Sequence, residues 1–274
     1  MKALLIKTGY KETFRPDLVY SSVSYGDILR STVILHVLKE YEVHWLTDIK
    51  AVPLIFGIKN IKEIHLVNTL DVLGLKTYSW DLIINLESSR GACQLSNELM
   101  QPQTKFIGYY LDVKKQKILT KPLYKGINWS EKLFSLFNLR WKNEPYLIPH
   151  TNCQIQKNLV FLNKLVGPKL PQKKWDGWDN LEKLLRNNGF NTSEQKSQVI
   201  EDFIKEIQKA EFVISTDSLG MHIALALNKI VLGIFGPTDA REVSGLKHYL
   251  KGNLPKLKAE KVFKKFMEIK NGYN

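Results

Sequence analysis

Short apolar segments typical of buried strands alternate along this chain with segments of helical periodicity. In the first half we expect strands at residues 3–7, 42–46, 61–67, 80–86 and 104–109, and helices at 26–41, 50–56 and 129–139. In the second half we expect strands at 158–163, 211–215 and 230–235, and helices at 175–187, 193–210, 217–228 and 257–269. This alternation predicts an α/β protein whose mostly parallel sheets are covered by helices on both faces.

The segment 143–152 interrupts the alternation with two prolines and several turn-forming residues. We therefore predict two domains, residues 1–148 and 149–274, which suits a length of 274 residues. The last helix, 257–269, is amphipathic and could also pack back on the first domain. Open parallel sheets bind ligands at the carboxyl ends of their strands, so we expect a cleft between the domains to hold the site.

The composition excludes several classes of protein. Hydrophobic residues are 44% and charged residues 24%, as in ordinary globular proteins and unlike disordered chains. No apolar run reaches the roughly 18–20 residues of a membrane span, and the apolar start is too short for a signal peptide. Cys93 and Cys153 are far apart without metal-ligand spacing, so we predict no zinc site, no disulfide scaffold and a cytoplasmic location.

The chain is strongly basic, with a formal charge of +13. Many of its lysines form two clusters, at 114–125 and 247–270. Such an excess suits phosphorylated small molecules, an anionic membrane surface or nucleic acid. Two solvated faces without a partner explain the pattern equally well.

The most informative segment runs from Phe212 through Ile-Ser-Thr-Asp-Ser to His222, and Val231 to Asp239 follows it. A strand leads here into a hydroxyl-rich turn and a helix, whose first backbone N–H groups can bind a diphosphate. Thr216 and Ser218 could donate further hydrogen bonds, and Asp217 could bind a sugar hydroxyl. Helix capping explains the same pattern about as well, and His222 is more often a packed residue than a catalytic one.

Two further segments carry candidate site residues. Ser21 to Asp27 leads into the first long helix, where Asp27 could accept a proton from a substrate hydroxyl or could simply cap the helix. In Lys173-Lys-Trp-Asp-Gly-Trp178 the first lysine could neutralise a phosphate. The two tryptophans could stack on a base, but packing of the helix on its sheet is the better interpretation. The sequence contains no P-loop, Gly-x-Gly-x-x-Gly fingerprint, nucleophile elbow, metal-ligand cluster or known nucleic-acid module.

These segments together resemble glycosyltransferase family 9, the bacterial heptosyltransferase family. The resemblance is carried by 26–32 (Gly-Asp-Ile-Leu-Arg-Ser-Thr), 44–47, 51–54 and 80–86, and most specifically by 214–218 with His222 and 235–239. It implies two Rossmann-like domains facing across a cleft (the GT-B fold), with a shortened second domain. It also implies an inverting transfer without metal or cofactor of a heptose, typically from ADP-heptose, to a saccharide such as lipopolysaccharide core.

By the same resemblance, Asp27 is the catalytic base, with Ser24, Gly26 and Arg30 on the acceptor side. The implied donor-binding residues are Lys173, Asp217, Ser218, Leu219, Gly220, His222 and Thr238. The sequence departs from the family pattern at Leu219, where glycine is usual, at 166–171, at 10–23, and at 186–200, which is short.

The resemblance implies a cytoplasmic enzyme that could contact the inner face of the membrane through its lysine clusters. Three alternatives stay open from the sequence. One is a catalytically degenerate protein that binds a glycan or nucleotide on the same scaffold. The others are a basic nucleic-acid-binding protein, which we do not favour, and an epimerase of the same fold.

Overall fold

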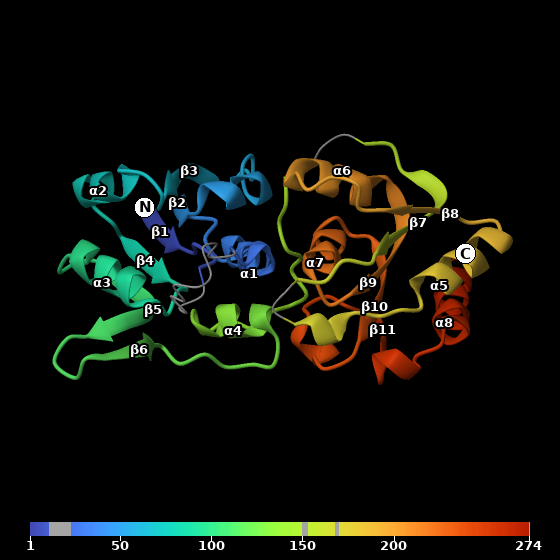
Figure 1. Ribbon diagram of the computed structural model, residues 1–274. Coiled ribbons are helices and arrows are strands. Elements are labelled where there is room, and N and C mark those ends of the chain that lie inside the picture. The colour runs from blue at the N-terminus through green and yellow to red at the C-terminus, as the bar shows by residue number, and fades with distance from the viewer. Residues whose placement is uncertain (11–22, 150–152, 168–169, 274) are drawn as a thin grey trace. The chain divides into compact units, whose positions relative to one another are not determined.

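The computed structural model describes residues 1–10, 23–149, 153–167 and 170–273. The chain forms two compact units, residues 1–149 and 150–274 (Figure 1). This division lies one residue from the boundary expected after residue 148. Residues 11–22, 150–152 and 168–169, which include parts of the segments 10–23, 143–152 and 166–171 discussed above, lie outside the described residues.

Unit 1 contains a six-stranded sheet in the order β3-β2-β1-β4-β5-β6. Neighbouring strands are parallel except β5 and β6, which are antiparallel. The strands are β1 (Lys2–Ile6), β2 (Glu42–Thr47), β3 (Ile61–Leu66), β4 (Leu82–Asn85), β5 (Lys105–Asp112) and β6 (Lys117–Lys121). The α-helices are α1 (Tyr25–Ser31), α2 (Asp71–Gly74), α3 (Arg90–Leu99) and α4 (Trp129–Ser135). The described part of the unit also contains three 3-10 helices, η1 (Thr32–His36), η2 (Ile49–Leu54) and η3 (Leu75–Thr77).

The apolar strands of unit 1 form its core, as the sequence predicts. β1 is almost entirely buried, and Leu4 and Ile6 pack with Trp80 beneath α2 and η3. The helix predicted over 26–41 is wrong in its length, because α1 ends at Ser31 and continues as a 3-10 helix. Ser31 and Thr32 donate their hydroxyls to carbonyls of the preceding turn, which competes with regular helical hydrogen bonding.

Unit 2 contains a five-stranded parallel sheet in the order β11-β10-β9-β7-β8. The strands are β7 (Gln156–Asn163), β8 (Asn191–Glu194), β9 (Ala210–Thr216), β10 (Ile230–Phe235) and β11 (His248–Lys251). The α-helices are α5 (Trp178–Asn187), α6 (Ile200–Lys209), α7 (Leu219–Ala226) and α8 (Ala259–Gly272), and the 3-10 helices are η4 (Pro171–Lys173), η5 (Ala240–Glu242) and η6 (Leu254–Lys256). α5 and α8 pack together on one face of the sheet, and α6 and α7 pack together on the other (Figure 1).

One expectation for unit 2 needs correction, and the position of its last helix is now defined. The helix predicted over 193–210 begins only at Ile200, because residues 191–194 pair with β7 as the short strand β8. The last helix packs its apolar face, Val262, Phe266 and Ile269, into the core of unit 2, where α5 and the sheet cover it.

The prediction of an α/β protein with two mostly parallel, helix-covered sheets is confirmed. Among the described residues, no helix is both long enough and apolar enough to span a membrane.

Candidate functional site

Three predicted donor-side residues meet at the carboxyl end of β9. The ammonium of Lys173, at the end of η4, lies 2.6 Å from Oδ2 of Asp217 and also donates to the Asp217 backbone carbonyl at 3.0 Å. Nε2 of His222 lies 3.9 Å from the other carboxylate oxygen. His222 is buried in α7, while the side chains of Lys173 and Asp217 retain 16% and 15% exposure. The segment 171–173 is thus held against the β9–α7 turn.

The carboxylate of Asp217 is kept ionised by its neighbours. Burial alone would raise its pKa, but the charges of His222 and Lys173 and the hydrogen bond from Lys173 outweigh this and lower it. Thr238 lies close to this carboxylate and adds a smaller lowering of its pKa, and its buried Oγ1 has no hydrogen-bond partner within the described residues. At neutral pH the carboxylate of Asp217 is therefore ionised where it meets the side chains of Lys173 and His222.

Asn163, at the carboxyl end of β7, is a site residue that the sequence analysis missed. Its side chain is 1% exposed, and Nδ2 donates to Oγ of Ser215 at 2.7 Å and to Oγ of Ser218 at 2.6 Å. A Cβ on Gly220 would lie 2.6–2.7 Å from the side-chain atoms of Asn163. Gly220 is therefore needed so that the amide can pack against the first turn of α7.

The start of α7 is arranged to receive an anion. Ser218 is its N-cap residue; its hydroxyl accepts from Asn163 and makes no side-chain capping bond. The first N–H groups of an α-helix lack partners within the helix and carry partial positive charge. Leu219 occupies the first helical position, so its side chain branches from the turn where the family pattern has glycine. With Lys173, this end of α7 can bind a diphosphate.

In unit 1 the predicted acceptor-side residues surround the start of α1. Ser24 donates its hydroxyl to Oδ2 of Asp27 at 2.6 Å, and Nη1 of Arg30 lies 4.0 Å from Oδ1. The Asp27 side chain remains 37% exposed, so a substrate hydroxyl could reach it. The backbone N–H of Ser24 donates to the carbonyl of Gly9, which ties the start of α1 to the chain leaving β1.

The carboxyl ends of β1 and β4 carry a second charged group that the sequence analysis missed. Glu87 is 4% exposed, and its Oε1 accepts from the backbone N–H groups of Thr8 and Gly9 at 2.7 Å each. The ammonium of Lys7, also buried, lies 3.3 Å from the same oxygen. Glu87 and Lys7 thus hold the chain that leaves β1, and the carbonyl of Gly9 in that segment accepts from the backbone N–H of Ser24 at the start of α1.

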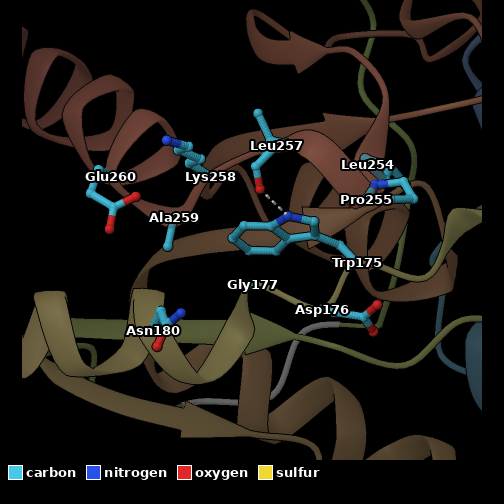
Figure 2. Close-up of a pocket in the computed structure, with 10 residues that line it drawn as sticks. All are labelled: Trp175, Asp176, Gly177, Asn180, Leu254, Pro255, Leu257, Lys258, Ala259 and Glu260. Atoms are coloured by element: carbon cyan, nitrogen blue, oxygen red, sulfur yellow. Dashed lines mark hydrogen bonds between the residues drawn. The ribbon is translucent and has the colours of Figure 1, made fainter.

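A shallow pocket of about 680 Å³ lies in unit 2 between the starts of α5 and α8, and Figure 2 shows its lining residues. None of them belongs to the predicted donor site. The Trp175 ring is 1% exposed, and its Nε1 donates to the Leu257 carbonyl at 2.9 Å. Trp178 meets it edge-on at 4.9 Å. The interpretation of this tryptophan pair as packing is confirmed.

Two further features of the described residues bear on partners. The lysines of the cluster 114–125 are all exposed around the β5–β6 hairpin. One group of side chains, His44, Glu63 and His65, could hold a metal ion, which the sequence analysis did not expect.

Comparison with known proteins bears on the segment that carries the α7 site. Residues 197–271 match the model of glycosyltransferase family 9 (heptosyltransferase). The predicted resemblance to this family is therefore confirmed. With it, the prediction of a glycosyltransferase is confirmed, and the match includes Asp217, Ser218, Gly220, His222 and Thr238. No curated protein matches the sequence.

Solved structures share the fold over almost the whole chain. A glycosyltransferase family 9 protein from Veillonella parvula is 14% identical with a TM-score of 0.76, covering 98% of this chain and 96% of its own. The ADP-heptose lipopolysaccharide heptosyltransferase II of E. coli is 13% identical with a TM-score of 0.73, covering 100% and 99%. E. coli heptosyltransferase WaaC with ADP-2-deoxy-2-fluoro heptose is 16% identical with a TM-score of 0.68, covering 98% and 99%. At these identities the likeness confirms the predicted fold class.

Proposed function

We propose that this glycosyltransferase moves a heptose or related sugar from a nucleotide-activated donor, with ADP-heptose favoured, to a saccharide acceptor such as lipopolysaccharide core. One observation carries the proposal. At the N-terminus of α7, Lys173 contacts Asp217, and Ser218 makes no side-chain capping bond. Asp217 and Ser218 lie within the segment that matches family 9. A structural neighbour was solved with an ADP-sugar, which supports this class of donor.

In the proposed mechanism, the donor diphosphate binds at the start of α7. The Lys173 ammonium leaves Asp217 and pairs with the phosphate. The Asp217 carboxylate then accepts a hydrogen bond from a hydroxyl of the donor sugar. The Asp217 carboxylate thus holds the lysine side chain in place until the donor arrives. The first backbone N–H groups of α7 and the Ser218 hydroxyl donate to the remaining phosphate oxygens.

Asp27 acts as general base in the same scheme. It takes the proton of the acceptor hydroxyl while the acceptor oxygen bonds to the anomeric carbon of the donor sugar. The bond between that carbon and the phosphate oxygen breaks, and the nucleoside diphosphate leaves with the bonding electrons. Attack opposite to the leaving group inverts the anomeric centre.

We propose that no metal takes part in the transfer, because Lys173 and the α7 N-terminus can stabilise the charge on the leaving diphosphate. After treatment with EDTA, adding Mg²⁺ or Mn²⁺ is expected to leave the rate of transfer unchanged. A strict requirement for either ion would contradict this part of the proposal.

Donor binding is tested by thermal shift and calorimetry with ADP-heptose, ADP and other nucleotide sugars. The wild-type chain is expected to bind an ADP-sugar, and Lys173→Gln to weaken binding by about 10- to 100-fold, as expected for a lost charge-assisted contact of about 1.5–3 kcal/mol. Lys174→Gln is the matched control, because the Lys174 side chain is 72% exposed and pairs only with the exposed Asp176 at 3.4 Å in the described residues. Equal binding by both variants would remove Lys173 from the donor site.

Catalysis is tested by mass spectrometry of the acceptor after incubation with donor. Asp27→Asn is expected to lower transfer by at least about 100-fold while donor affinity stays unchanged. Asp71→Asn is the control, because Asp71 likewise lies in the first turn of a helix of unit 1, away from the site residues. Donor binding without transfer to any acceptor by the wild-type chain would favour the degenerate binding protein instead.

The lysine clusters lead us to propose that the enzyme works beside an anionic surface at the inner face of the membrane. Basic residues near such a surface contribute about 1 kcal/mol each. Sedimentation with anionic vesicles is expected at low salt and not with neutral vesicles, and equal sedimentation with both would contradict it.

A further inference from the structure

Two buried histidines and one glutamate on neighbouring strands of unit 1 aim three ligand atoms at one point. Nδ1 of His44 lies 3.0 Å from Nε2 of His65 and 3.3 Å from Oε2 of Glu63. The same glutamate oxygen lies 3.9 Å from Nε2 of His65. His44 and His65 are 3% and 5% exposed, and the Glu63 side chain is 46% exposed.

The strand register explains why these residues meet. β2 and β3 are parallel neighbours, with His44 opposite Glu63 and Leu46 opposite His65. Residues 63 and 65 are two apart on one strand, so their side chains share a face of the sheet. The aromatic rings of Tyr78 and Trp80 lie edge-on against His44 at 5.1 Å each and enclose the cluster.

The spacing of the three atoms suits a metal ion. Zinc binds imidazole nitrogen and carboxylate oxygen at about 2.0–2.2 Å, so ligand atoms of a tetrahedral site lie about 3.3 Å apart. The observed separations of 3.0, 3.3 and 3.9 Å bracket this value. Two imidazoles and one carboxylate form a common zinc ligand set that leaves a fourth position for water, and the exposed side of Glu63 gives water access to it.

Neighbouring groups orient the ligand atoms for metal binding. The Tyr78 hydroxyl donates to Oε2 of Glu63 at 3.1 Å and orients the carboxylate, as outer partners do in metal sites. Nε2 of His44 is buried with no hydrogen-bond partner among the described residues, so Nδ1 is the nitrogen turned to polar groups.

We propose that His44, Glu63 and His65 form a zinc site that links the edge strand β3 to β2. The site shares no residue with the groups around Asp27 and Asp217. Zinc here therefore stabilises unit 1 and takes no part in sugar transfer. Other divalent transition metals would bind the same ligands, with Cu²⁺ strongest by the general order of affinities.

The test is zinc binding by the EDTA-treated full chain, measured by calorimetry and by metal analysis after dialysis. We expect one zinc ion per chain, an increase in melting temperature on adding Zn²⁺, and visible absorption of tetrahedral character with Co²⁺. Glu63→Gln, at a half-exposed position, is expected to fold and to lose zinc affinity by more than about 100-fold, since even outer partners of a metal site are worth 10- to 100-fold. His65→Asn is expected to do the same.

His248→Gln is the matched control, because His248 lies on β11 in unit 2 and meets Tyr273 rather than a carboxylate. It is expected to bind zinc like the wild-type chain. Absence of zinc binding would show that the two imidazoles merely share a hydrogen bond, and equal binding by wild type and Glu63→Gln would place the zinc elsewhere. Either result overturns the proposal and leaves the proposed transferase function unaffected.

Discussion

The contact between Asn163 and Gly220 provides a sharp test of how the α7 site is built. In the Gly220→Ala variant the new methyl group would lie 2.6–2.7 Å from three side-chain atoms of Asn163, which is too close for any of them. Overpacking of this kind costs about 1–3 kcal/mol, and alanine in place of glycine in a helix returns at most about 1 kcal/mol. We therefore expect Gly220→Ala to lower the free energy of unfolding by about 1–2 kcal/mol.

The Asn163→Ala variant removes the two hydrogen bonds to Ser215 and Ser218. At about 1 kcal/mol each, the loss is about 2 kcal/mol. The double variant Asn163→Ala/Gly220→Ala removes the amide and with it the clash. It keeps the gain of at most about 1 kcal/mol from alanine in the helix, so its free energy of unfolding falls by only about 1–2 kcal/mol. Independent effects would sum to about 3–4 kcal/mol, and the coupling free energy is thus at least about 1 kcal/mol in favour of the double variant.

Urea unfolding followed by tryptophan fluorescence and circular dichroism measures these differences. Gly74→Ala is the control, because a Cβ on this helical glycine of α2 would meet no atom within 4 Å. It is expected to be as stable as the wild-type chain or slightly more stable. A Gly220→Ala variant without loss of stability, or a double variant with the full additive loss, would refute the packing argument.

Three further predictions follow from charges and contacts in both units. Glu87→Gln leaves the buried Lys7 without its ion-pair partner and is expected to cost about 3–5 kcal/mol, measured by urea unfolding; a loss below 1 kcal/mol would contradict a buried pair. The folded-state pKa of Asp217 lies below its unfolded value of about 3.9. The ionised carboxylate therefore stabilises the folded state above that pH, and this stabilisation is lost as pH falls through the lower folded pKa. Asp217→Asn should therefore be less sensitive to acid than wild type between pH 5 and 2, about the range in which an Asp titrates, and identical acid unfolding curves would count against this. Trp175→Phe loses the hydrogen bond to the Leu257 carbonyl and should cost about 1 kcal/mol, with donor binding unchanged in calorimetry.

The fold was predictable because its central strands are strongly apolar. β1, β4, β7, β9 and β10 are buried along most of their length, and each was expected within a few residues of its observed bounds. The strands that the sequence analysis missed, β6, β8 and β11, are four or five residues long, lie at sheet edges and carry few buried side chains. Their identity depends on pairing with a neighbour, which local periodicity does not report.

The candidate site was predictable only where a local sequence pattern marks its residues. Asp27, Asp217 and Ser218 stand where an apolar strand gives way to a helix, and this local pattern marks them. Asn163 is 55 residues from Ser218, and Glu87 is 79 residues from the Thr8 that it contacts, so only the fold joins them. A polar residue that directly follows a buried apolar run, as Asn163 follows residues 159–162 in β7, is the one signal that could have identified it.

The four sheet edges of the two units bear on how the protein behaves at high concentration. An edge strand with free backbone groups can pair with the same edge of another copy and begin aggregation. Three of these edges are only four or five residues long, and β6 begins and ends with the exposed lysines Lys117 and Lys121. Strand pairing between two copies would bring these ammonium groups together. The lysines that we propose to bind an anionic surface would therefore also keep copies of the chain apart. Substitutions that remove charge from β6 are then expected to weaken surface binding and to favour pairing between copies.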